Sequence, residues 1–408
     1  MSKPIFEQLD NGIRLAYQYA QSPVAHLGFY FGSGSRVEKA DQAGLVHFLE
    51  HSLFKGTKKR KAFHVLSRID SVGGELNAYT SKEELCLYAS FTKKHFTRAL
   101  ELLADISIHS TFPAKEIAKE KEVIYDEINS YLDAPSDKIF DDFEMHLFKD
   151  HSLGANILGT KESVQKLKSI DLKDFAKTHF VKNNLVISYV GDLDIEKLKK
   201  SIALFLEEMP DKGSVQDISI FKQTRTFHIK ENFSNFQTHC ILGGLAPGYT
   251  DEDRVYISML MNMLGGPALN SILNLSIREK YGYSYNIEAN YQSFQEIGYW
   301  QIYFGCDPKN LDQTLKLVHK SMDDLCNVEL SERQLHRYKE QLKGQIALSM
   351  DSNIGIMQGN AKSVLMFNQI ESIENTFKII DELEASKLLL VAQTYLNKKQ
   401  RNSLIYYC

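Results

Sequence analysis

The sequence is short of the features that mark secreted and membrane proteins. It has only five cysteines in 408 residues, an odd number, and none of them forms a Cys-x-x-Cys pair. This pattern argues against a disulfide framework and against a cysteine-held metal cluster. Residues 1–10 lack the apolar core of a signal peptide, and no apolar run approaches the length of a membrane span. We therefore expect a cytoplasmic protein with reduced thiols and no membrane partner.

An excess of positive charge is also missing. The net charge of −4 gives no support for nucleic-acid binding. The one basic cluster, at residues 55–61, is short, and we interpret it as a solvated loop, with steering of acidic substrates as the alternative. The Gly-Ser-Gly-Ser run at 32–35 is too short and wrongly placed for a phosphate-binding loop. The remaining composition, 43% hydrophobic and 25% charged, is that of a globular protein with room for two domains.

What the sequence does contain is a His-x-x-Glu-His motif, formed by His47, Glu50 and His51 in an apolar, proline-free run. The run favours a helix over residues 44–54. On a helix the two histidines share one face and could hold one metal ion, with Glu50 beside them as a base. This order is the inverzincin form of the zinc-hydrolase signature. A chance pair of surface histidines is the alternative, which the apolar surroundings disfavour because buried polar groups need partners.

A catalytic zinc ion normally has three protein ligands, so a third is expected elsewhere in the chain. The best candidate segment is 112–130, where Pro113 near the start and a charged, alanine-containing body favour a helix. Glu120 and Glu127 lie two turns apart on one face of this helix. Spacing alone does not choose among the acidic residues of the segment, and on spacing alone a solvated Glu/Lys face is the better explanation.

Further motifs extend the pattern over nearly the whole chain. They lie at residues 32–36, 44–51, 54–57, 73–81, 120–127, 151–154 and 184–192. In order and spacing they resemble the pitrilysin family of inverzincin zinc metallopeptidases, which includes insulysin and the mitochondrial processing peptidases. The chain is similar to the short, bacterial-type members.

The resemblance implies a role for each residue of the first motif. His47, His51 and Glu127 would hold one zinc ion per chain, and Glu50 would be the catalytic base. Glu120 would orient a ligand histidine.

The same resemblance assigns substrate-binding residues. A peptide would pair with an edge strand at Asn77, Ala78 and Tyr79, for which an ordinary strand start is the alternative. In the second half, the motif Arg-Glu-Lys-x-Gly-x-x-Tyr runs from Arg278 to Tyr285. In the family the arginine and the tyrosine reach the substrate, where they can grip a carbonyl or carboxylate and stabilise an oxyanion. Taken alone, a surface arginine and a packed tyrosine would be the simpler explanation.

The two halves of the sequence look like diverged copies of one unit. A strand with a glycine-rich end, an acidic loop and a helix occur at 25–54 and again at 238–264. In the second copy Met259, Asn262 and Met263 stand where the metal-site residues stand in the first. The second copy therefore keeps the scaffold without the metal ligands.

We expect a zinc-binding domain over 1–210 and a homologous domain without metal ligands, carrying the Arg/Tyr motif, over 217–408. The stretch 207–216, with its proline, glycine and serine, is the expected join. Strand and helix pairs without nucleotide-binding glycine motifs predict an α+β fold. Each domain would be a mainly antiparallel mixed sheet covered by helices, as in the processing peptidases.

These features together predict a zinc-dependent endopeptidase that hydrolyses short or unfolded peptides in a closed chamber. The resemblance implies a chamber made by two chains. Because this chain carries both the zinc motif and the Arg/Tyr motif, we expect a homodimer, and a heterodimer with a related chain stays open. The competing class is a non-catalytic assembly or structural subunit of the same fold, which usually lacks the zinc residues. A zinc hydrolase acting on non-peptide substrates has no supporting motif.

Overall fold

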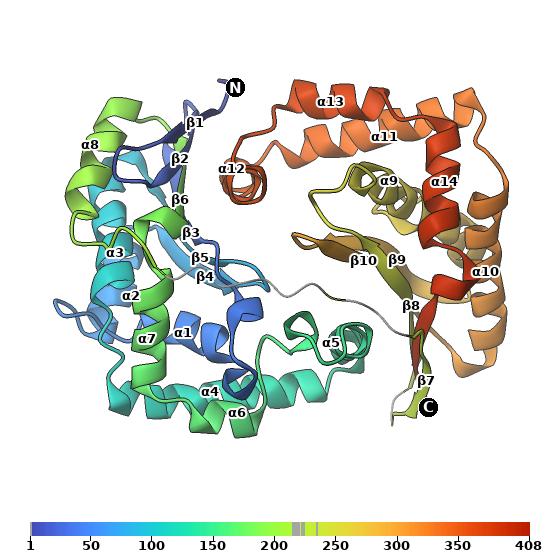
Figure 1. The fold of residues 1–408 in the computed structure, drawn as a ribbon, viewed down its shortest axis with the longest axis horizontal. Helices are drawn as coiled ribbons and strands as arrows, with labels where there is room; N and C mark the ends of the chain where they lie inside the picture. Colours follow the sequence, from blue (N-terminus) through green and yellow to red (C-terminus); the bar gives the residue numbers. More distant parts are fainter. Residues whose placement is uncertain (1, 214–220, 222–224, 234–235) are drawn as a thin grey trace. The chain divides into compact units, whose positions relative to one another are not determined.

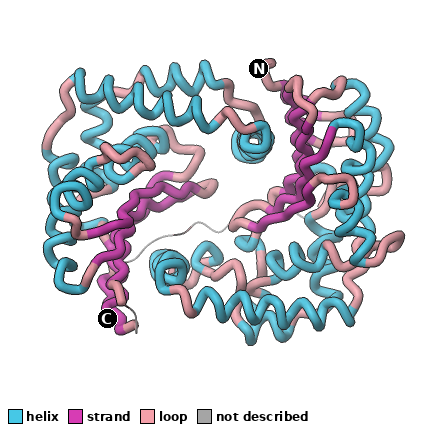
Figure 2. The backbone as a smooth tube through the Cα atoms, turned by 180° about the vertical axis from the view of Figure 1, so that it is seen from behind, coloured by secondary structure: helices cyan, strands magenta, loops and turns pink. Residues whose placement is uncertain are grey.

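The computed structural model describes residues 2–213, 221, 225–233 and 236–408. It divides into two compact units (Figures 1 and 2). Unit 1 consists of Met1–Asn129, Ala155–Ile218 and Leu348–Ser372, and unit 2 consists of Ser130–Gly154, Ser219–Ala347 and Ile373–Cys408. Each unit contains one mixed sheet with helices packed against it, which confirms the predicted fold class.

The sheet of unit 1 is six-stranded and mainly antiparallel. Its strands are β1 (Ile5–Gln8), β2 (Arg14–Tyr19), β3 (Val24–Phe31), β4 (Glu75–Thr80), β5 (Leu85–Thr92) and β6 (Leu185–Gly191). The strand order is β1-β2-β6-β3-β5-β4, and only β2 and β6 are parallel neighbours. β4 stands at the end of this order, so it is an edge strand.

The sheet of unit 2 repeats this arrangement with five strands. They are β7 (His228–Asn232), β8 (Thr238–Pro247), β9 (Ser284–Ser293), β10 (Ile297–Cys306) and β11 (Asn402–Tyr407). The order is β7-β11-β8-β10-β9, and only β7 and β11 are parallel. Apart from the additional β1, the two sheets have the same order and directions, which confirms the predicted internal repeat.

Each unit also contains helices, several of which pack against its sheet. In unit 1 they are α1 (Leu45–Leu53), α2 (Ala62–Asp70), α3 (Phe96–His109), α4 (Ala114–Leu132), α6 (Lys161–Lys166), α7 (Ser169–His179), α8 (Ile195–Phe205) and α12 (Asn353–Phe367). In unit 2 they are α5 (Pro135–Leu147), α9 (Arg254–Gly265), α10 (Leu311–Asn327), α11 (Glu332–Ser349), α13 (Ile373–Asp381) and α14 (Ala385–Tyr395). Shorter helical segments are η1 (Ser35–Val37), η2 (Ala40–Gln42), η3 (Lys93–His95), η4 (Ser152–Gly154), η5 (Lys182–Asn184), η6 (Asn274–Glu279), η7 (Pro308–Asn310) and η8 (Lys398–Gln400).

Two helices are exchanged between the halves of the sequence. α5 comes from the first half and packs on β8 and β11 of unit 2, whereas α12 comes from the second half and packs on β2, β3 and β6 of unit 1 (Figure 1). Met357 and Val364 of α12 are buried against Tyr30 and Val186, and the Ser188 hydroxyl donates to the Met357 carbonyl at 2.7 Å. The limits 1–210 and 217–408 expected from the sequence do not include this exchange. Residues 214–216 of the expected join lie outside the described residues.

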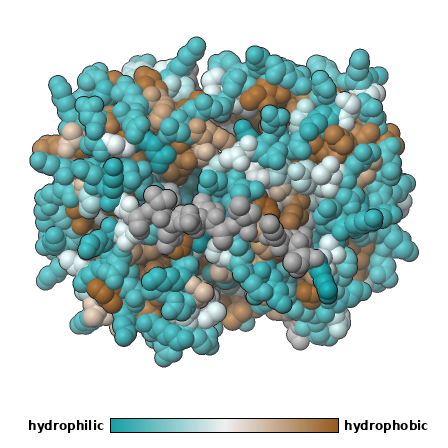
Figure 3. All heavy atoms as spheres, viewed as in Figure 1, coloured by the Kyte–Doolittle hydropathy of each residue, from teal (hydrophilic) through white to brown (hydrophobic). Residues whose placement is uncertain are grey.

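The described residues include no helix that is both long enough and apolar enough to cross a bilayer. The face drawn in Figure 3 is mainly hydrophilic, and its hydrophobic residues stand in separate small groups. All five cysteines are free thiols, as their number and spacing predict.

Candidate metal centre

Helix α1 carries the His-x-x-Glu-His motif and is fixed by burial. Leu45, Val46, Phe48, Leu49 and Leu53 all belong to the hydrophobic core of unit 1. Such side chains each contribute about 1.5–3 kcal/mol when fully buried, so the helix is firmly anchored. The structure thus confirms the predicted helix.

The start of α1 depends on Gly44 and Glu38. Gly44 has φ 89°, and a Cβ at this position would lie 2.6 Å from the main-chain oxygen of Leu158. The Glu38 carboxylate accepts hydrogen bonds from the main-chain N–H groups of Gly44 and Val46, at 2.9 and 2.7 Å. The Glu38 side chain satisfies N–H groups that the helix cannot pair. Burial raises the pKa of Glu38 to about 8, although these hydrogen bonds oppose the rise. Glu38 therefore positions the helix end next to His47.

His47, His51 and Glu127 converge on one point. Nε2 of each histidine lies 3.6 Å from Glu127 Oε2, and the ligand atoms of all three residues lie within 4.8 Å of one another. A separation of 3.6 Å is too long for a hydrogen bond. It is close to the edge, about 3.4 Å, of a tetrahedron with zinc–ligand bonds of about 2.1 Å. Two imidazoles and one carboxylate are also a donor set of catalytic zinc, so these residues fit the metal.

The two histidines have different electrostatic surroundings. Burial, together with the smaller effect of the neighbouring His51, lowers the pKa of His47 to about 4, so the His47 imidazole is neutral at pH 7. A neutral imidazole has the lone pair that a metal ligand needs. For His51, burial also lowers the pKa, but the hydrogen bond to Glu120 and the charge of Glu127 outweigh burial and raise it.

Glu120 holds His51 in a fixed orientation. Its Oε1 accepts a hydrogen bond from His51 Nδ1 at 2.9 Å, and its Oε2 lies 2.6 Å from the ammonium of Lys55. Because Nδ1 carries the donated proton, Nε2 is the nitrogen with a free lone pair, and Nε2 is the atom near Glu127. Lys55 belongs to the cluster expected to form a solvated loop, but its ammonium pairs with Glu120. Because α1 ends at Leu53, helical spacing gave no signal for this contact.

Glu50 belongs to helix α1, and its side chain contacts strand β4. Its Oε2 accepts a hydrogen bond from Thr80 Oγ1 at 2.6 Å. Burial raises the pKa of Glu50 above its ordinary value, and the Thr80 hydrogen bond opposes this rise. The role of Thr80 could not be predicted from the sequence, because contacts between a strand and a helix distant in sequence follow no spacing rule.

The expected peptide-binding residues lie in β4, which the structure confirms as an edge strand. Ala78 packs against the core of unit 1 and Asn77 is exposed. The Tyr79 hydroxyl donates to Glu84 at 2.9 Å, and the Lys362 ammonium of α12 lies 5.5 Å from the Tyr79 ring centre. The Tyr79 side chain is therefore engaged with the sheet and α12, which leaves main-chain groups as the feature that β4 offers to a peptide.

Arg278 and Tyr285 lie together in unit 2. Arg278 belongs to η6, a π-helical segment, and Tyr285 belongs to β9. The Arg278 guanidinium carbon lies 4.7 Å from the Tyr285 ring centre, and Tyr285 is 82% exposed. A guanidinium over an aromatic face is an attractive arrangement, and π-helical turns are frequent at functional sites.

The corresponding helices of unit 2 show how the fold is held without metal ligands. In the repeat, residues 338–345 of α11 match residues 120–127 of α4, so Asn262 of α9 and Gln345 of α11 stand at the positions of Glu50 and Glu127. Asn262 Nδ2 donates to Gln345 Oε1 at 2.7 Å. Met263, at the repeat position of His51, is completely buried. An amide–amide hydrogen bond and apolar packing thus replace the convergent histidines of unit 1.

Two protein-family models match different parts of the chain. The model of Insulinase (Peptidase family M16) matches residues 14–161, and that of the Peptidase M16 inactive domain matches residues 166–342. The chain is 31% identical to the Uncharacterized zinc protease YmxG of Bacillus subtilis, over 93% of this chain and 91% of that protein. It is 28% identical to the mitochondrial-processing peptidase subunit beta of Bos taurus, over 96% of this chain and 81% of that protein.

Solved structures show the same fold. A protease from Helicobacter pylori superimposes with a TM-score of 0.91 at 19% sequence identity, covering 100% of both chains. A structure titled peptidase M16 inactive domain, from Pseudomonas fluorescens, gives a TM-score of 0.92 at 19% identity, over 99% of this chain and 98% of that one. With both halves matched by family models and a relative of 31% identity over nearly the full length, the chain belongs to the insulinase family of peptidases, family M16.

Proposed function

We propose that the protein is a zinc-dependent endopeptidase that hydrolyses short or unfolded peptides. The observation that carries the proposal is the convergence of His47 Nε2, His51 Nε2 and a Glu127 oxygen. Glu50 lies on helix α1 with the two histidines. Relatives named zinc proteases support both the metal and the class of reaction. The resemblance further supports an enclosed reaction chamber.

Each residue of the centre has a role that follows from its contacts. His47, His51 and Glu127 would hold one zinc ion, which when bound acidifies a water molecule and polarises the peptide carbonyl. Glu50 takes a proton from the attacking water and passes it to the leaving amine nitrogen. Thr80 holds one oxygen of the Glu50 carboxylate, so the carboxylate keeps one orientation.

Two other groups would bind the substrate. The free edge of β4, with the main-chain groups of Asn77, Ala78 and Tyr79, would pair with a peptide as an added strand, which places few demands on the peptide's sequence. We propose that Arg278 grips a substrate carbonyl or carboxylate and that Tyr285 stabilises the oxyanion. The exposure of Tyr285 and its contact with Arg278 support a shared role.

We also propose that the chain acts as a homodimer in the cytoplasm. One chain carries both the zinc residues and the Arg278/Tyr285 pair, so a second, different chain is not required for either motif. Light scattering at micromolar concentration should give the mass of a dimer. A monomer would refute the homodimer, and a related chain that copurifies would favour the heterodimer.

Glu50→Gln tests the proposed reaction, because glutamine keeps the size of the side chain and removes the base. Zinc content is measured by elemental mass spectrometry, and cleavage is measured on a digested peptide library. We expect unchanged zinc and a rate lower by about 10²–10⁴-fold. Glu122→Gln, at an exposed position of α4, is the control and should change neither quantity. Wild-type turnover in zinc-loaded Glu50→Gln would refute the base, and a wild-type protein without zinc or cleavage would favour the assembly subunit.

A further inference from the structure

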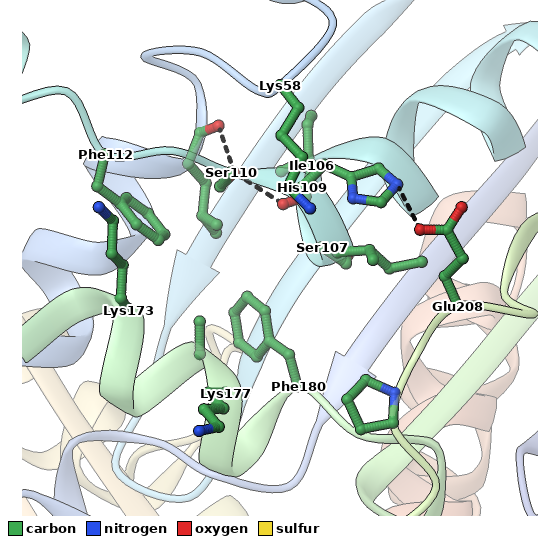
Figure 4. A pocket seen from close by; sticks show the side chains of 14 residues that line it. Lys58, Ile106, Ser107, His109, Ser110, Phe112, Lys173, Lys177, Phe180 and Glu208 are labelled. Atoms are coloured by element: carbon green, nitrogen blue, oxygen red, sulfur yellow. Dashed lines mark hydrogen bonds and ion pairs between the residues drawn. The ribbon is translucent and has the colours of Figure 1, made fainter. Parts of the chain in front are cut away.

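Unit 1 contains a pocket that none of the metal-site residues line (Figure 4). It has a volume of about 290 Å³ and lies between the ends of α1 and α3 and one side of α7. Its wall is apolar where Leu53, Ile106, Phe112 and Phe180 line it. We propose that this pocket binds a small organic anion with an apolar body, such as an aryl or alkyl carboxylate.

The rim of the pocket is positively charged. Lys58 comes from the loop after α1, and Lys173 and Lys177 come from consecutive turns of α7 (Figure 4). All three are exposed, and none has a side-chain hydrogen bond or ion pair with any described residue. Glu208 is the one acidic residue among the pocket's lining residues. Three ammonium groups against one carboxylate attract anions to this opening.

His109 lies in the pocket wall and has a buried ring nitrogen, Nδ1, without a hydrogen-bond partner in the described structure. The residue is only 8% exposed. Its Nε2 lies 3.6 Å from Glu208 Oε2, as the dashed line in Figure 4 marks. Leaving a buried donor or acceptor unpaired costs about 1–3 kcal/mol.

Main-chain contacts hold the pocket wall in place. The Lys58 N–H donates to the His109 carbonyl at 2.9 Å, and the Thr111 N–H donates to the Gly56 carbonyl at 3.1 Å. Phe112 has φ 48°, which is uncommon for a bulky residue, and its carbonyl accepts a hydrogen bond from Ser169 Oγ at 2.6 Å. A wall fixed in this way lowers the ordering cost of binding.

The size and lining of the pocket select the ligand class. A volume near 290 Å³ is at the lower end for small-molecule sites, about 300 Å³, and excludes a long peptide. Inorganic phosphate would satisfy the lysines but leave the apolar wall in contact with water. A neutral apolar molecule would cover the wall but leave the lysines without a partner. A carboxylate with an aryl or alkyl body can pair with the lysines and also cover the apolar wall.

The experiment is calorimetric titration of the full-length protein with 3-phenylpropionate, 3-phenylpropionamide and inorganic phosphate. We expect the carboxylate to bind at least tenfold more tightly than either of the other probes. The double variant Lys173→Gln/Lys177→Gln should weaken carboxylate binding at least fivefold. Both substitutions are at exposed positions, so the fold should persist, which thermal unfolding checks. Lys94→Gln, exposed in the same unit and outside the pocket, is the control and should bind as the wild type does.

Four results would overturn the proposal. Equal binding of the carboxylate and the amide, or carboxylate binding that the double variant does not weaken, would contradict recognition of the charge. Phosphate binding as tight as that of the carboxylate would contradict the claim that the apolar part of the ligand contributes to binding. The absence of binding by all three probes would contradict the site itself. None of these results depends on whether the zinc centre cleaves peptides.

Discussion

Replacing Thr80 with valine should move the pH dependence of peptide cleavage to higher pH. Thr80 Oγ1 donates to Glu50 Oε2 at 2.6 Å. Burial raises the pKa of Glu50, and this hydrogen bond lowers it, because the bond stabilises the ionised carboxylate. Valine has nearly the shape of threonine but no donor, so the substitution removes the hydrogen bond and leaves the packing close to that of the wild type.

The size of the shift follows from the energy of the bond. A hydrogen bond to a charged group contributes about 1.5–3 kcal/mol. One pKa unit corresponds to about 1.4 kcal/mol, so loss of the bond should raise the pKa of Glu50 by about 1–2 units. Since Glu50 acts as a base only when ionised, the acidic limb of the kcat/KM profile should move up by the same amount.

The assay is kcat/KM for a fluorogenic peptide between pH 5 and pH 9, with zinc content measured at both ends of the range. Thr80→Ser keeps the hydroxyl and is the matched control, which should retain the wild-type limb. An unchanged limb in zinc-loaded Thr80→Val would refute the reasoning. A shift of equal size in Thr80→Ser would also refute it, because the cause would then be the lost methyl group.

Three further predictions concern the support of the centre and the stability of unit 1. Gly44→Ala should destabilise the protein by about 1–3 kcal/mol in thermal unfolding, because alanine is strained at φ 89°; Gly344→Ala, with nothing within 4 Å of its Cβ, should not destabilise it. Glu120→Gln should weaken zinc binding about 10–100-fold in chelator competition, since His51 loses its ionised partner; equal affinity would contradict the role of Glu120. Burial lowers the pKa of His179 from its ordinary value, about 6.5, to about 4, so the unfolded chain binds the proton first as the pH falls. Neutral His179 contributes fully to the free energy of unfolding above pH 6.5, and this contribution should fall by about 3 kcal/mol as the pH falls towards 4. In urea unfolding, His179→Gln should lose that much less stability than the wild type over this pH range.

The metal centre divides into a part that sequence can predict and a part that it cannot. His47, Glu50 and His51 lie within five residues on one helix, so helical geometry alone brings them together. Glu127 is distant in the chain, and α4 carries several acidic side chains with equally good spacing, so its choice required the resemblance to a family.

The supporting contacts were beyond sequence reasoning for a physical reason. Thr80 and Glu38 act through single hydrogen bonds to α1 from other segments, and such bonds leave no periodic pattern in the sequence. The sheet against which α12 packs could not be predicted from the sequence either. Its apolar residues favour a buried helix, but hydrophobic burial is non-directional and does not say which sheet the helix covers.

The exchange of α5 and α12 has a consequence for the evolution and handling of this chain. A polypeptide ending at residue 213 would lack α12, so the apolar face formed by Tyr30, Val186 and Val190 would meet water, and its own α5 would have no sheet to cover. The complementary piece would carry an unpartnered α12 and an uncovered sheet. Each piece therefore holds what the other needs to fold. Splitting the gene at this point would create two obligate partners, and a protease cut there would leave a nicked protein whose fragments stay associated.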